Sequence, residues 1–125
     1  MFDHVSLNVS DYEVSKRFYE QALAPLGYSV RVEFADWKSA GFGADGVDGD
    51  FWIAEGEPRA MGVHVAFQAS DHATVDAFHA AGLAAGGTDN GPPGIREQYH
   101  PTYYGAYVLD PDGNNVEAVC HDAPT

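Results

Sequence analysis

The chain has 125 residues, 45% of them hydrophobic, which is enough to bury the core of one ordinary domain or of two small halves. Its 19 Asp and Glu residues outnumber its 6 Lys and Arg, and the formal charge of −13 argues against binding to a nucleic-acid backbone. No apolar run approaches a membrane span, so we expect neither a nucleic acid nor a membrane as partner. The single cysteine, Cys120, excludes an intrachain disulfide, and the default expectation is a cytoplasmic protein.

Residues 4–27 and 64–87 are two copies of one unit. They align without gaps at an offset of 60, and eight of the 24 aligned pairs are identical, where chance would give about one or two. The identical pairs are His4 with His64, Val5 with Val65, Ser10 with Ser70, Asp11 with Asp71, Phe18 with Phe78, Leu23 with Leu83, Ala24 with Ala84, and Gly27 with Gly87. Each copy therefore opens on a histidine.

Each copy predicts a strand followed by a helix. In the first copy, polar and apolar residues alternate over 4–9, which is the period of a half-buried strand. Ser10 and Asp11 are candidate N-caps, and Gly27 lies just after the expected helix. The second copy repeats the pattern and ends on Gly86 and Gly87. In the first helix, the apolar positions at helical spacing are Val14, Phe18 and Ala22.

Shorter strand candidates follow each helix, so that each half reads as β-α-β-β-β and the fold class is α+β. We expect one domain over residues 1–125, with module one at about 1–57 and module two at about 62–121. The strand candidates are Tyr28–Phe34, Ser39–Phe42 and Phe51–Ala54, then Tyr104–Leu109 and Asn115–Cys120, with a weaker pattern at Arg96–Tyr103. The expected turns are Asp45–Gly49, Gly91–Gly94 and Asp110–Gly113.

The duplicated histidines are candidate metal ligands. If the two repeats pack about a pseudo-twofold axis, His4 and His64 face one another. Two imidazoles close together favour a divalent metal ion, and two structural histidines are the alternative. The other residues on the same strand faces are small or polar, which predicts a cavity; they are Ser6, Asn8, Ala66 and Gln68.

A third candidate ligand is Glu117. It lies in the otherwise apolar strand candidate Asn115–Cys120. A lone carboxylate in such a strand is costly unless it is paired or bound to a cation. A solvent-facing position on an edge strand is the alternative.

These features resemble the vicinal oxygen chelate superfamily, which includes glyoxalase I, extradiol dioxygenases, bleomycin-resistance proteins and fosfomycin-resistance enzymes. The resemblance rests on His4, His64 and the segment 110–117, and it extends from residue 2 to about 121. It implies two tandem βαβββ modules that form an incomplete mixed β-barrel around a metal ion, with His4, His64 and Glu117 as ligands. It also implies a homodimer, because family members pair their modules within a chain or across a dimer, so that His4 can share its metal with His64 of a second copy.

The resemblance also separates a four-ligand site from a three-ligand one. Glyoxalase I has a fourth protein ligand, a carboxylate on the last strand of its first module. Aligning Asp48–Gly49 with Asp112–Gly113 makes Ile53 the counterpart of Glu117, and isoleucine cannot bind a metal. We therefore expect three protein ligands and open positions, an arrangement that favours Fe²⁺, with Zn²⁺, Mn²⁺ and Ni²⁺ as alternatives.

The leading hypothesis is an enzyme, dioxygenase-like or lyase- or isomerase-like, that acts on a small molecule with two adjacent oxygens. His100 is the candidate general acid or base, and Tyr104 is a second catalytic candidate near the cavity. An exposed loop histidine with no role is the alternative for His100. The second hypothesis is a bleomycin-resistance-type protein that sequesters a small cationic molecule in an acidic cleft without catalysis. The third is an inactive member kept for dimerisation or ligand sensing.

Overall fold

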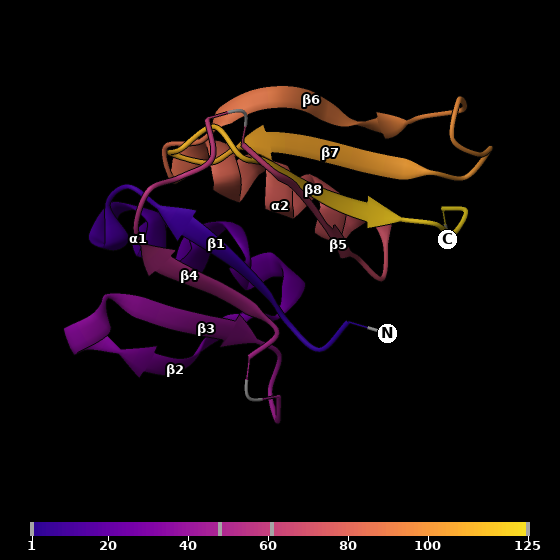
Figure 1. Cartoon of the computed structure of the whole chain (residues 1–125). Helices are drawn as coiled ribbons and strands as arrows, with labels where there is room; N and C mark the ends of the chain where they lie inside the picture. The colour runs from indigo at the N-terminus through magenta and orange to yellow at the C-terminus, as the bar shows by residue number, and fades with distance from the viewer. Residues whose placement is uncertain (1, 48, 61, 125) are drawn as a thin grey trace.

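The computed structural model describes residues 2–47, 49–60 and 62–124, and it consists of two modules of the same design (Figure 1). Module one contains β1 (Val5–Val9), α1 (Tyr12–Ala22), η1 (Ala24–Leu26), β2 (Ser29–Phe34), η2 (Ala35–Trp37), β3 (Ser39–Gly43) and β4 (Phe51–Glu55). Module two contains β5 (His64–Gln68), α2 (His72–Ala84), β6 (Thr88–Ile95), β7 (Tyr104–Leu109) and β8 (Asn115–Cys120). Neither α1 nor α2 is long and apolar enough to cross a membrane.

The two modules form two four-stranded mixed sheets with matching topology. The strand orders are β1-β4-β3-β2 and β5-β8-β7-β6. In each sheet the first strand runs parallel to the last strand of its module, and the remaining pairs are antiparallel. The sheets do not close on each other, so the predicted α+β fold of two βαβββ modules in an incomplete barrel is confirmed.

Both helices begin at an aspartate. The Asp11 carboxylate accepts a hydrogen bond from the backbone N–H of Val14 at 3.2 Å, and Asp71 caps α2 in the same way at 2.7 Å. The predicted apolar stripe of α1 is partly wrong, because Val14 faces solvent while Ser15 is buried. The buried stripe consists of Tyr12, Ser15, Phe18, Tyr19 and Ala22.

The strand after α2 lies earlier than the sequence pattern predicted. β6 spans Thr88–Ile95 and contains the expected turn 91–94, whereas residues 96–103 form turns and not a strand. The pairing of β6 with β7 shifts register on both sides of Gly91. Pro92 and Pro93 lack backbone N–H groups, which is tolerated here because β6 is an edge strand and its ladder is already irregular.

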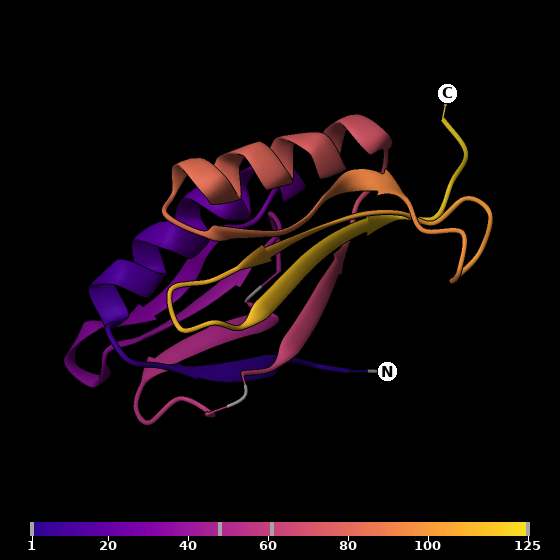
Figure 2. The same cartoon turned by 90° about the horizontal axis from the view of Figure 1, so that it is seen from above.

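The two helices lie on the same side of the sheets (Figures 1 and 2). The buried apolar side chains of both modules form one cluster. Phe67 of β5 packs edge-on against Phe51 of β4, with ring centroids 5.3 Å apart. The hydroxyl of Tyr19 on α1 donates to Asp110, which lies between β7 and β8, at 2.5 Å. The opposite faces of both sheets are left without a helix over them, and the candidate site lies there.

Candidate functional site

The centre of the site is the buried carboxylate of Glu117. The parallel register of β5 and β8 pairs His64 with Asn115 and, two residues further along, Ala66 with Glu117. Glu117 is 1% exposed, and its Oε1 lies 2.8 Å from Nε2 of His64, whose side chain is 52% exposed. The hydroxyl of Tyr103 donates to Oε2. The structure therefore brings two of the three predicted ligands together, and it leaves His64 open to solvent beside a fully covered carboxylate.

Two tyrosines surround this carboxylate. Burial and the hydrogen bond to Glu117 raise the pKa of Tyr103 far above its usual value. Burial and the negative charge of Glu117 also raise the pKa of Tyr107. Both phenols therefore keep their protons at neutral pH, and the Tyr103 hydroxyl is the donor to Glu117. Gly105 lies between them in sequence, and a side chain there would begin 3.3 Å from Oε2 of Glu117, so its absence leaves room for the cluster.

The position of Tyr103 and Tyr107 around the Glu117 carboxylate was not predicted from the sequence. The signal that would have found them is the period of two: residues 103, 105 and 107 alternate with the residues of β7 that face the helix side. Tyr104, the predicted catalytic residue, is on that helix side. Its hydroxyl donates to Asp76 of α2 at 2.6 Å, and its ring stacks on His72 at 3.8 Å.

His100, the predicted general acid or base, lies in the turn segment before β7. Its Nε2 is 2.8 Å from Nδ1 of His121, and its ring centroid is 5.4 Å from that of Tyr103. The structure therefore places His100 next to Tyr103 and separates it from Glu117 by that ring.

The environment of Tyr104 favours its protonated form. The hydrogen bond to Asp76 and, to a smaller extent, burial of the phenol raise the pKa of Tyr104 to about 12.

His4 is not gathered with the other two candidate ligands. It precedes β1, and its Nδ1 lies 2.7 Å from the carboxylate of Asp3. Across residues 2–47, 49–60 and 62–124, no group of three or more His, Cys, Asp and Glu side chains is arranged to hold a metal ion. The donor set inside one chain therefore fits a metal only in part: His64 and Glu117 supply two ligands, and a third has to come from elsewhere.

Module one carries no carboxylate at the position that corresponds to Glu117. β1 pairs Ser6 with Trp52, just as β5 pairs Ala66 with Glu117. The counterpart of Glu117 is therefore Trp52, and the alignment that chose Ile53 was wrong by one residue; Asp48, on which it depended, lies outside the described residues. Ile53 is fully buried on the other face. Neither side chain can bind a metal, so the absence of a fourth carboxylate at this position stands.

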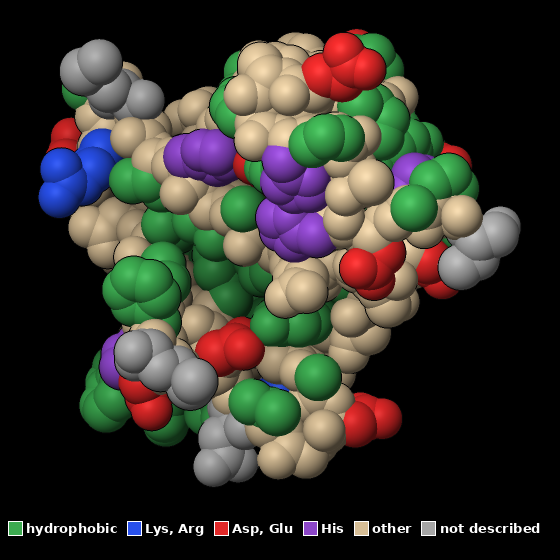
Figure 3. Space-filling view, turned by 90° about the vertical axis from the view of Figure 1, so that its right-hand side faces the viewer, with side chains coloured by type: hydrophobic (Ala, Val, Ile, Leu, Met, Phe, Trp, Pro, Cys, Tyr) green, Lys and Arg blue, Asp and Glu red, His purple; other side chains and the backbone are tan. Residues whose placement is uncertain are grey.

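The side of the molecule shown in Figure 3 carries histidine side chains beside a hollow with hydrophobic side chains at its floor. A pocket of about 260 Å³ lies here between the first strands of the two modules, and His4 and Gln68 are among its lining residues. A second open pocket, on the uncovered face of module one, is lined by His4, Phe34 and Trp52. Both pockets are large enough for small molecules.

Paired βαβββ modules with a histidine at the start of module two and a glutamate on its last strand define a vicinal oxygen chelate protein. The chain belongs to the glyoxalase/bleomycin resistance protein/dioxygenase superfamily, whose family profile matches residues 1–118. The resemblance seen in the sequence is thereby confirmed.

Several solved structures have the same fold. A glyoxalase/bleomycin resistance protein from Albidiferax ferrireducens is 37% identical, with a TM-score of 0.80 and coverage of 96% of this chain and 98% of that chain. A mutant glyoxalase I from Zea mays is 26% identical with a TM-score of 0.67, and the match covers 94% of this chain but 46% of that one. A glyoxalase-related enzyme from Fulvimarina pelagi, 18% identical with a TM-score of 0.72 over 96% of this chain and 87% of that chain, supports the fold alone. No curated protein matches the chain.

Proposed function

We propose that the protein is a divalent-metal-dependent enzyme that acts on a small molecule with two adjacent oxygens. The observation that carries the proposal is the Glu117 carboxylate, which is 1% exposed and faces a half-exposed imidazole at 2.8 Å. Burying a carboxylate costs on the order of several kcal/mol unless a cation or several hydrogen-bond donors compensate its charge. A divalent ion between Glu117 and His64 supplies that compensation, and the exposed side of His64 leaves a path for substrate.

The third ligand in this proposal is His4 of a second copy. Within one chain, His4 is not grouped with His64 and Glu117. The uncovered face of module one carries Trp52 stacked on Phe34 at a ring-centroid distance of 6.1 Å, and Trp37 beside them is 74% exposed. An exposed aromatic surface of this kind is typical of a protein interface. In a homodimer that places this face over module two of the partner, His4 of each copy lies beside His64 and Glu117 of the other copy.

The donor set of two imidazoles and one carboxylate suits Fe²⁺ best, with Zn²⁺, Mn²⁺ and Ni²⁺ as alternatives. When bound, such an ion supplies Lewis acidity to the two oxygens of the substrate. Residues of the chain orient the metal ligands and transfer protons. The Tyr103 hydroxyl holds the outer oxygen of Glu117 and so fixes the orientation of the carboxylate. We assign proton transfer to His100, which contacts the Tyr103 ring; Tyr104, on the helix side, is the second residue to test.

The cytoplasm remains the proposed location, since the one cysteine is buried and free and no intrachain disulfide stabilises the fold.

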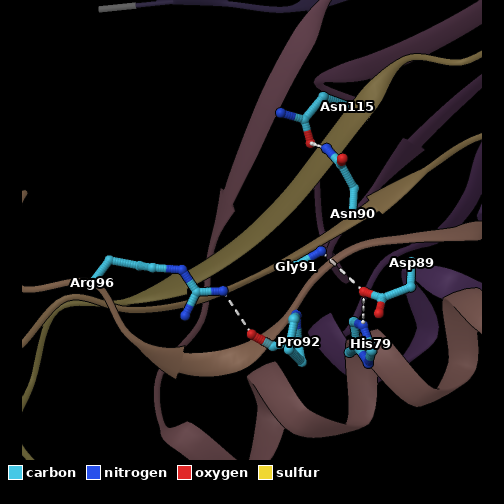
Figure 4. Close-up of polar contacts among 7 residues, drawn as sticks. All are labelled: His79, Asp89, Asn90, Gly91, Pro92, Arg96 and Asn115. Carbon is cyan, nitrogen blue, oxygen red and sulfur yellow. Dashed lines mark hydrogen bonds and ion pairs between the residues drawn. The ribbon is translucent and has the colours of Figure 1, made fainter.

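Metal content tests the proposal. Protein purified without chelator is loaded with Fe²⁺ under anaerobic conditions, and separately with Zn²⁺, then passed over a desalting column and assayed for metal per chain. We expect about one ion per chain in the wild type and almost none in His64→Ala or Glu117→Gln. The matched control is His79→Ala. His79 lies on α2 and pairs with Asp89 of β6, so its loss should leave the metal content unchanged (Figure 4).

Two results would contradict the proposal. One is wild-type protein that stays metal-free after loading while it binds small aromatic cations, which would favour a sequestering protein of the bleomycin-resistance type. The other is metal content that survives His64→Ala at the wild-type level, which would move the metal site elsewhere.

A further inference from the structure

The guanidinium of Arg96 lies over the ring of Tyr107, the tyrosine beside Glu117 in module two. Its Cζ lies 5.3 Å from the ring centroid of Tyr107. The ring centroid of His64 lies 6.3 Å from the same ring. Arg96 and the proposed metal ligand His64 are therefore neighbours of one aromatic ring, although the loop that carries Arg96 is 32 residues further along the chain.

The irregular part of β6 holds this guanidinium in place. Nη2 of Arg96 donates to the carbonyl oxygen of Pro92 at 2.6 Å (Figure 4). A Cβ at Gly94 would lie 3.0 Å from Nη1, and a Cβ at Gly91 would lie 3.3 Å from Nη2. The two glycines therefore leave the space that the guanidinium occupies. The segment Gly91–Gly94, which disrupts the β6 ladder, therefore positions the Arg96 side chain.

The charge of Arg96 has no carboxylate partner within residues 2–47, 49–60 and 62–124. The chain is strongly acidic, and three of its five other Lys and Arg side chains pair with carboxylates: Lys16, Arg31 and Lys38. A guanidinium has five N–H donors in a planar fork that matches a carboxylate. The hydrogen bond to Pro92 is the one contact of this kind that the guanidinium makes with the described part of the chain.

We propose that Arg96 binds an anionic group, in particular the carboxylate of a small substrate whose adjacent oxygens lie at His64 and Glu117. For the two chelating oxygens of the substrate, this inference rests on the proposed function. For the anionic group, it rests on Arg96 alone. The substrate class is thus a carboxylate that also carries a chelating pair of oxygens, such as a hydroxy or dihydroxy acid. In a chain with a formal charge of −13, a fixed guanidinium offsets the repulsion that an anion meets.

The first experiment uses metal-free protein, so that it does not depend on the metal site. Benzoate and its neutral isostere benzamide are titrated while the NMR signal of the Arg96 side-chain Nε–H is followed. We expect benzoate to bind about tenfold more tightly than benzamide, because a charge-assisted hydrogen-bond pair discriminates by roughly that factor. Arg96→Gln, followed by backbone amide shifts, should remove the preference. The matched control Arg17→Gln makes the same charge change on an exposed face of α1 and should retain it.

A second variant keeps the charge and moves it. Gly94→Ala adds a Cβ 3.0 Å from Nη1 of Arg96, so the guanidinium has to shift by a few tenths of an ångström. We expect the benzoate preference to fall several-fold with the net charge unchanged. This variant also serves if Arg96→Gln does not fold.

The metal-loaded protein separates this inference from the proposed function. Catechol and 3,4-dihydroxybenzoate share one chelating group and differ by a carboxylate. We expect Arg96→Gln to weaken 3,4-dihydroxybenzoate about tenfold and to leave catechol unchanged, whereas His64→Ala abolishes metal-dependent binding of both and keeps the benzoate preference of the metal-free protein. Equal affinity of wild-type protein for benzoate and benzamide, or a preference that survives Arg96→Gln, overturns the inference even if the metal site is correct.

Discussion

Replacing Tyr103 by Phe removes one oxygen atom from the site and tests the arrangement around Glu117. The Tyr103 hydroxyl donates to Oε2 of a carboxylate that is 1% exposed, and His64 holds the other oxygen. A hydrogen bond to a charged acceptor contributes about 1.5–3 kcal/mol, and its loss leaves a buried charged oxygen without a donor. For a chain of this length, that loss corresponds to a fall in Tm of roughly 5–12 °C.

The same substitution also tests the proposed role of Glu117 as a metal ligand. A residue that orients a metal ligand typically changes affinity about 10–100-fold when it is removed. We expect metal affinity to fall by that factor for Tyr103→Phe in a competition titration against a fluorescent chelator. In urea denaturation of metal-free protein, the free energy of unfolding should fall by about 1.5–3 kcal/mol.

The adjacent residue provides the control. Tyr104→Phe also removes one phenolic oxygen, but that oxygen donates to Asp76 on an exposed part of α2. Its loss should cost no more than about 1 kcal/mol and should leave metal affinity unchanged. Metal affinity that falls with Tyr104→Phe and not with Tyr103→Phe would refute the geometry described for the site and restore Tyr104 as the functional tyrosine.

Two further predictions concern packing and pH. Tyr19→Phe breaks the 2.5 Å hydrogen bond from module one to Asp110 and should destabilise the protein by about 1.5–3 kcal/mol in urea denaturation, whereas an unchanged midpoint would show that this bond does not join the modules. Hydrogen bonds from Lys16 and Tyr12 hold the pKa of Glu33 below its usual value of 4.5, so its contribution to stability is complete above that value and is lost as the pH falls through the lower folded-state pKa. Glu33→Gln should therefore flatten the acid limb of a Tm-against-pH curve, and an identical limb in the variant would contradict this.

The duplication predicted the modules well because strand–helix alternation is encoded locally. Eight identities at one offset locate both histidines and both helix caps, whereas Gly27 follows the short η1 turn and α1 already ends at Ala22. The buried face of α1 could not be found in the same way. Tyr12 and Tyr19 enter the core because their hydroxyls reach Glu33 and Asp110, each at 2.5 Å. Such partners lie far away in sequence, and an apolar stripe that counts only hydrophobic residues misses them.

In the candidate site, too, the residues with a local sequence signal were predicted and the others were not. His64 and Glu117 were identified from a repeat and from a lone carboxylate in an apolar strand, and the structure brings them together. The contact of Tyr103 with Glu117 and the position of Arg96 were missed because the strand before them was misplaced. Gly91–Gly94 has the composition of a turn, and only the edge position of β6 explains how two prolines fit in a strand.

The central claim, a metal site that two copies of the chain build together, is tested most directly by subunit complementation. His4→Ala and His64→Ala chains with different affinity tags are co-expressed, and the mixed dimer is purified through both tags. Each variant alone should bind almost no metal. The mixed dimer contains one site with both histidines and one site with neither, so we expect about half the wild-type metal content per chain. A mixed dimer as metal-free as its two parents, or a His4→Ala protein with the full wild-type content, would contradict the shared site.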